Sequence, residues 1–400
     1  MINALTTTSM LRRVAAIWVI TCSALFFTYS ITHPLAEWDM LVYAASAEKL
    51  NGTPRNQIHA TVYGDLQSKL SEAEFQKVTT GDSYRAAMYE DEEAFLEQIP
   101  FYRIRVTFNS IIAFAGRSGI GIYEAGHFVS TTAFTLCFLL VWFGFRQHIH
   151  PIFQITMPVL FYKYTRELEV MQQILADSLA SVWVAIICIA YTRRSRLLLP
   201  LIAVAVLVRV DLFIFSGLML LMLLLTEPKH RFPAIFACGA FLVTAFLMIQ
   251  NLADSYGWKT LYYFAFISEM SATHPSIYSH IEFSFQDYLT ALYDPPRWIS
   301  KMYLITVLCS LFTLFTWNQA RNLTEFEHRV CRVSGICLVY ITAHYMIFPQ
   351  MYLRFFVAQN FMVFTGFVVI TSCYLESTLR SKDQAPASHA SAGTRFSNYR

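Results

Sequence analysis

Long apolar runs alternate with shorter polar segments along most of this chain. Ten runs are recognisable, at residues 14–32, 121–145, 151–163, 172–191, 197–208, 212–225, 232–250, 302–318, 331–348 and 354–376. An upright membrane-spanning helix needs about 20 apolar residues, so the runs at 151–163, 197–208 and 212–225 are short for that role. The pattern predicts an all-α polytopic membrane protein with eight to ten transmembrane helices.

Basic residues between the runs predict the orientation of the helices. If the N-terminus is cytoplasmic, every even-numbered run is followed by basic residues, namely Arg146, Arg193 to Arg196, Lys229 to Arg231, Arg321 to Arg332, and Lys382. This agrees with the preference of Lys and Arg for the cytoplasmic side. One alternative keeps the same charge pattern: a single helix over 197–225, with 151–163 as a re-entrant or interfacial segment.

Two polar segments are then extracytoplasmic, a large one at 33–120 and another at 251–301. The first contains two stretches with helical apolar spacing, at 35–50 and at 101–114. The stretch at 101–114 begins with Arg103 and Arg105 and has the pattern of an amphipathic helix lying in the membrane interface.

We therefore expect residues 1–380 to form a single membrane domain, with the first run retained as a signal anchor. Residues 381–400 carry serine, alanine and charge without an apolar period, which predicts a disordered cytoplasmic tail.

Composition agrees with a membrane protein and narrows the possible chemistry. The chain is 56% hydrophobic and 14% charged, against about 25% charged in an average soluble domain. Its eight cysteines all lie in or beside apolar runs, which disfavours disulfides and cysteine metal sites. The net charge is only +3, and the basic residues are spread over short loops, so nucleic acid is not an expected partner.

Two acids, Glu37 and Asp39, follow the first apolar run directly, with Trp38 between them as an interfacial anchor. Acids held at a membrane surface under a folded segment lose hydration, and this favours a functional reason for keeping them. Glu37 and Asp39 are therefore the candidate catalytic groups, and the sequence does not decide which of them is the base.

Other charged residues stand at the predicted outer ends of apolar runs. These candidate substrate-binding residues are Arg103, Arg105, Arg166, Glu167, Glu169, Arg209, Asp211, His344 and Arg354. Carboxylates accept protons and guanidinium groups bind phosphate, so a site on this face has the means for group transfer. The simpler alternative is that each charge is solvated or snorkels, and that Arg209 and Asp211 form a local ion pair.

Four short motifs in this order resemble the GT-C superfamily of integral-membrane glycosyltransferases. Glu37-Trp38-Asp39 and the following helix ending in Leu50-Asn-Gly-Thr-Pro54 resemble the acidic first outer loop of that family. Pro100-Phe-Tyr-Arg103 is similar to the start of its juxtamembrane helix. Arg166-Glu-Leu-Glu169 resembles its second acidic motif, and Val208-Arg209-Val-Asp211 resembles its arginine-acid element.

The resemblance implies transfer of a hexosyl or pentosyl group from a polyprenyl-phosphate-linked donor to a cell-envelope glycan or lipid acceptor. It further implies a bacterial inner membrane with the site on the periplasmic side. Asp39 would be the general base, with Glu37 as an alternative, while Arg103, Arg105 or Arg209 would stabilise the leaving phosphate. A divalent metal as cofactor stays open, as do two other functions: a lipid-linked glycan polymerase or ligase, and a transporter or flippase.

Overall fold

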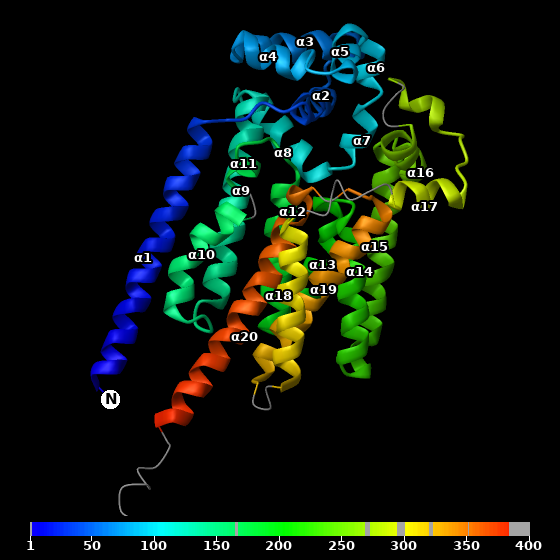
Figure 1. Cartoon of the computed structure of the whole chain (residues 1–400). Coiled ribbons are helices and arrows are strands. Elements are labelled where there is room, and N and C mark those ends of the chain that lie inside the picture. Colours follow the sequence, from blue (N-terminus) through cyan, green and yellow to red (C-terminus); the bar gives the residue numbers. More distant parts are fainter. Residues whose placement is uncertain are drawn as a thin grey trace, which may run out of the picture.

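The computed structural model describes residues 2–164, 167–268, 273–293, 301–319, 323–350 and 352–383, and all regular structure in these ranges is helical (Figure 1). A bundle contains α1 (Ile2–Thr32), α9 (Ile122–Phe145), α10 (Pro151–Tyr164), α11 (Glu167–Met171), α12 (Asp177–Thr192), α13 (Leu198–Val208), α14 (Leu212–Thr226), α15 (Phe232–Leu252), α18 (Lys301–Gln319), α19 (Glu325–Ile347) and α20 (Val357–Asp383). The all-α prediction is confirmed for the described residues.

Shorter helices gather at one end of this bundle (Figure 1). They are α2 (Asp39–Asn51), α3 (Arg55–Lys69), α4 (Glu72–Thr79), α5 (Ser83–Glu90), α6 (Glu92–Leu96), α7 (Ile99–Arg103), α8 (Val106–Arg117), α16 (Gly257–Tyr262) and α17 (Phe285–Tyr293). Single turns complete the fold as η1 (Lys229–Arg231), η2 (Tyr263–Ile267), η3 (Pro275–Tyr278) and η4 (Leu353–Phe356). We call the helices α2 to α8 the end layer.

Each of the ten predicted apolar runs lies mostly or wholly within a helix. Within the described ranges, five helical segments are long and apolar enough to cross a membrane: Ser9–Thr32, Ile122–Phe145, Lys229–Leu252, Glu325–Ile347 and Arg354–Leu375. Five shorter apolar helices accompany them, at Pro151–Tyr162, Asp177–Thr192, Leu198–Val208, Leu212–Thr226 and Tyr303–Trp317. The chain is thus an all-helical protein with candidate membrane-spanning helices suited to a lipid bilayer.

The bundle and the end layer have separate apolar cores. The bundle core is built mainly where α12 packs along α9 and where α20 packs against α18 and α19. The end-layer core surrounds α2, whose Leu41, Val42 and Ala45 are fully buried among aromatic and aliphatic side chains of α3, α6 and α8. Because both faces of α2 are covered, its position relative to the bundle is fixed by packing.

The alternative of one helix over 197–225 is wrong. α13 ends at Val208, Arg209 adopts an extended backbone (φ −158°, ψ 130°), and α14 begins at Leu212 and packs back against α13. The reason lies in the side chains, because Arg209 and Asp211 are turned into the protein, where other charged residues contact them.

The prediction of one helix from Phe101 to Phe114 is wrong at its start. α7 ends at Arg103 and α8 begins at Val106, with Arg105 outside helical geometry (φ −91°, ψ 62°). Side chains bind the carbonyl groups that the break exposes: Arg105 Nη1 donates to Phe101 O at 2.6 Å, and Asn109 Nδ2 donates to Tyr102 O at 2.9 Å. Such bonds satisfy the free carbonyls of a helix end.

The segment after α15 docks onto the end layer through polar contacts. Arg103 pairs with Asp254 at 2.6 Å and donates to Leu252 O at 2.9 Å, while Gln98 Nε2 donates to Thr273 O at 3.2 Å. Helix α20 continues to Asp383, beyond the predicted start of the disordered tail, and the rest of that predicted tail lies outside the described residues.

Because α19 and α20 pack closely at Gly366, one methyl group added there should have a large effect on the stability of the fold. A Cβ at Gly366 would overlap Ser334 Oγ and lie 3.1 Å from Ser334 Cβ, whereas a Cβ at Gly335 meets nothing within 4 Å. We expect Gly366→Ala to lower the free energy of unfolding by about 1–3 kcal/mol, because overpacking pushes the helices apart. Thermal denaturation of the purified protein in nanodiscs measures this.

The matched control is Gly335→Ala, which adds the same methyl group on the same helix pair without a clash. We expect its melting temperature to equal or slightly exceed that of the wild type, because alanine favours the helix. Equal melting temperatures for the two variants would contradict the packing described here.

Candidate functional site

Six of the residues selected from the sequence lie together where the end layer meets the bundle. They come from the start of α2, the α7–α8 break, the α13–α14 turn, the C-terminal part of α19, and η4: Asp39, Arg105, Arg209, Asp211, His344 and Arg354. With Asp177 at the start of α12, which pairs with Arg209, we call them the buried charged cluster.

Asp39 is the first residue of α2 and binds two partners. Its Oδ1 accepts a hydrogen bond from Tyr102 Oη at 2.7 Å, and its Oδ2 pairs with Arg354 Nη2 at 2.7 Å. Burial raises the pKa of Asp39. The charge of Arg354, the hydrogen bond from Tyr102 and the charge of Arg105 together outweigh this effect, so the pKa lies below that of an ordinary aspartate. Asp39 is therefore an ionised carboxylate at neutral pH.

Arg105 lies between two acids of the cluster. Its guanidinium packs over the rings of Tyr102, at 4.7 Å, and Tyr43, at 5.7 Å, which hold it by cation–π contacts. Its positive charge acts on both Asp39 and Asp211. The break between α7 and α8 thus gives Arg105 an inward position that Arg103, two residues earlier, does not share.

Arg209 and Asp211 form the second half of the cluster. Arg209 is 6% exposed and pairs with Asp177 through Nη1 and with Asp211 through Nε, the latter at 2.8 Å. Asp211 Oδ2 is 3.3 Å from His344 Nε2 and 3.5 Å from Tyr340 Oη. The local-pair interpretation of Arg209 and Asp211 is therefore incomplete, because three further residues contact the pair.

One aromatic ring joins the two halves of the cluster. The guanidinium groups of Arg209 and Arg354 lie 5.2 and 5.3 Å from the centre of the Phe355 ring. The negative charges of three carboxylates balance the positive charges of three guanidinium groups, and His344 adds a positive charge when it is protonated. The six groups belong to Asp39, Asp177, Asp211, Arg105, Arg209 and Arg354.

Two nitrogen atoms of the cluster are buried without a hydrogen-bond partner in the part of the chain that the structure describes. They are Arg354 Nε, a donor, and His344 Nδ1, which donates when it carries a proton and accepts when it does not. A buried donor without an acceptor costs about 1–3 kcal/mol, so Arg354 Nε calls for a functional explanation. This donor suits a ligand with anionic oxygens.

Glu37 and Arg103, also selected from the sequence, make their contacts outside the cluster. Glu37 lies 3.7 Å from Lys77 and 4.0 Å from Arg85 and is one-third exposed, and Arg103 pairs with Asp254. Glu169 is exposed on α11. Arg166 and the side chain of Glu167 lie outside the described residues.

Sequence reasoning missed four residues of this region: Asp177, Tyr102, Tyr340 and Phe355. A signal existed for Asp177, since it is an acid inside the predicted apolar run 172–191. Tyr102 lies within the Pro100-Phe-Tyr-Arg103 motif but was not selected. Tyr340 and Phe355 are aromatic residues in apolar surroundings, and nothing in the sequence distinguishes them from core residues.

The donor set of the cluster does not suit a metal ion. Its carboxylates already face guanidinium groups, and within the described ranges no three His, Cys, Asp or Glu side chains converge as metal ligands.

Fold and site together define an all-helical chain with candidate membrane spans and a charge-balanced cluster buried at one end. No protein-family model, curated protein or solved structure matches it.

The Asp39–Arg354 pair predicts a pH-dependent stability difference. Because the folded-state pKa of Asp39 is lowered, the pair stabilises the fold above the ordinary aspartate pKa, and this contribution is lost as pH falls through the folded-state value. Arg354→Leu removes the largest opposing charge, so burial then raises that pKa. We expect a loss of stability of about 2 kcal/mol near neutral pH, and this loss narrows as the pH falls towards the ordinary aspartate pKa.

Melting temperatures of both proteins over this pH range measure the difference. Lys77→Leu, which removes an exposed partner of Glu37, is the control and should change stability by less than about 0.5 kcal/mol at every pH. A stability loss in Arg354→Leu that does not vary with pH would count against the pairing.

Proposed function

We propose that this protein is an integral-membrane glycosyltransferase of the GT-C type. It would use eight to ten spans and move a sugar from a polyprenyl-phosphate donor to a glycan or lipid of the cell envelope, on the extracytoplasmic face. The observation that supports this best is the buried cluster, in which the ionised Asp39 pairs with Arg354 and lies in the field of Arg105, while Arg209 belongs to the other half of the same cluster.

The arginines have the properties that a phosphate leaving group requires. Breaking the bond between a sugar and a phosphate builds negative charge on the phosphate oxygens, and fixed guanidinium groups away from water stabilise such charge strongly. Arg354 has a free Nε donor, and Arg105 is held by two tyrosine rings. His344 offers a further donor when protonated.

In this proposal, binding of the polyprenyl-phosphate-linked sugar changes the partner of Asp39. A phosphate that attracts Arg354 would weaken the 2.7 Å pair and leave Asp39 facing the acceptor. The acceptor oxygen then attacks the anomeric carbon, its proton passes to Asp39, and the bond from that carbon to the phosphate breaks. Polyprenyl phosphate leaves with the electron pair. A weakly basic carboxylate fits a proton transfer that follows bond formation, when the hydroxyl is most acidic.

The test compares the two acids of the Glu37-Trp38-Asp39 motif. We expect Asp39→Asn to reduce sugar transfer by about 10²–10⁴-fold, because the base is lost. Glu37→Gln should retain activity within about threefold, because the contacts of Glu37 lie outside the cluster. Radiolabelled polyprenyl-phosphate hexoses and pentoses, supplied with membrane lipids to the protein in nanodiscs, provide the assay.

Melting temperatures of the variants separate loss of chemistry from loss of fold. Equal transfer by Asp39→Asn and wild type would rule out Asp39 as the base. Formation of no new glycosidic bond from any donor would overturn the transferase proposal. Movement of the same lipid-linked sugars across proteoliposomes without bond formation would instead identify a flippase.

A further inference from the structure

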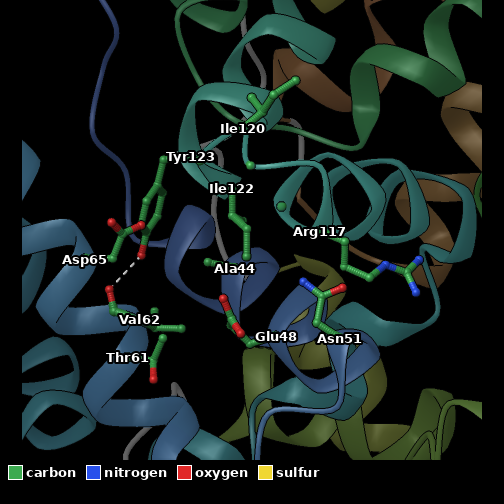
Figure 2. A pocket seen from close by; sticks show the side chains of 13 residues that line it. Ala44, Glu48, Asn51, Thr61, Val62, Asp65, Arg117, Ile120, Ile122 and Tyr123 are labelled. Atoms are coloured by element: carbon green, nitrogen blue, oxygen red, sulfur yellow. Dashed lines mark hydrogen bonds between the residues drawn. The ribbon is translucent and has the colours of Figure 1, made fainter.

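A pocket lies in the end layer, away from the buried charged cluster. It is a pocket of about 540 Å³ between α2, α3 and the turn from α8 to α9. Figure 2 shows Glu48 between Asp65 on one side and Asn51 and Arg117 on the other. Ligand pockets for small molecules have volumes of about 300–1,000 Å³, so this one has room for a molecule larger than a single sugar.

The pocket and the cluster are separate sites on one helix. Asp39 is the first residue of α2, and Glu48 follows nine positions later, which corresponds to about 13 Å along the axis. The buried centre of α2, including Leu41 and Ala45, lies between them.

Polar groups on the pocket wall keep hydrogen-bonding capacity in both directions. Glu48 accepts a hydrogen bond from Thr53 through one oxygen, and Asp65 Oδ2 pairs with Lys69 at 3.2 Å, so each carboxylate keeps a second oxygen. Asn51 Oδ1 is buried without a partner among the described residues. The exposed Arg117 lines the rim on the other side, with its guanidinium directed away from Glu48 (Figure 2). A hydroxyl group, which both donates and accepts, suits such a wall.

Most of the remaining wall is apolar. Ala44, Val62, Ile122 and Tyr123 contribute it, and the Tyr123 hydroxyl is held in place by donating to Val62 O at 2.9 Å (Figure 2). An apolar surface bordered by hydrogen-bonding groups fits a sugar ring, which has C–H faces and hydroxyl edges.

The turn that closes the pocket requires glycine at one position. Gly119 has φ +84°, which L side chains rarely adopt. The backbone shape of this rim thus depends on Gly119.

Other ligand classes fit less well. Two carboxylates beside one guanidinium disfavour a phosphate, and no trio of His, Cys, Asp or Glu ligands for a cation occurs in the described part of the chain. A wholly apolar ligand would leave the buried Asn51 Oδ1 without a partner.

We infer that this pocket binds a neutral polyhydroxylated ligand, a short glycan, through Glu48, Asn51 and Asp65. The inference goes beyond glycosyl transfer, since binding in this pocket does not require chemistry at the cluster.

Saturation-transfer NMR tests the inference on the full chain in nanodiscs free of sugar-headed detergent. The probes are maltotriose, cellotriose, mannotriose and chitotriose, each at millimolar concentration. We expect saturation transfer to at least one of them. Thr61→Trp, which fills the pocket from an exposed position on α3, should reduce that signal at least fivefold. Gln67→Trp, exposed on α3 away from the pocket, should leave it unchanged.

Glu48→Gln and Asp39→Asn complete the design. Glu48→Gln keeps the size of the side chain and should weaken the signal, while Asp39→Asn, at the separate cluster, should leave it intact even if transfer is lost. Absence of saturation transfer to all four probes would overturn the inference. So would a signal that Thr61→Trp leaves unchanged, or one that disappears only in Asp39→Asn.

Discussion

The pairing of buried charges at the junction of the end layer and the bundle is the constraint on which this structure depends. Arg209, at 6% exposure, would be very costly to bury alone, and it is stable there because Asp177 and Asp211 both contact it. These partners come from different helices, so α12 and the α13–α14 turn must keep their relative positions. The Asp39–Arg354 pair fixes α2 against η4 in the same way.

Two interruptions of helical structure make this pairing possible. An unbroken helix over 197–225 would place Arg209 and Asp211 on different faces, because residues two apart differ by about 200°. The extended backbone at Arg209 instead lets both side chains meet. At the break between α7 and α8, Arg103 pairs with Asp254, whereas Arg105, which has left helical geometry, enters the cluster.

The sequence predicts the fold class and most residues of the buried charged cluster. It does not predict that these residues come together in space. Apolar runs predict helices because burial in lipid or core requires them, and charges beside such runs are conspicuous because burying them is costly. The pattern of apolar and charged residues does not distinguish Glu37 from Asp39. They differ because α2 begins at Asp39, which turns that carboxylate towards Tyr102, while Glu37 precedes the helix and lies near Lys77. Such differences depend on tertiary packing.

A charge-balanced cluster also has a consequence for binding. With three acids and three arginines paired, an added phosphate would bring excess negative charge, and a carboxylate would have to give up part of its pairing to accommodate it. Arg354 is the arginine best placed to change partner, since its Nε donor is unused and it is more exposed than Arg209. In the proposed reaction, phosphate binding and the pairing of Asp39 would therefore be coupled through the guanidinium group of Arg354.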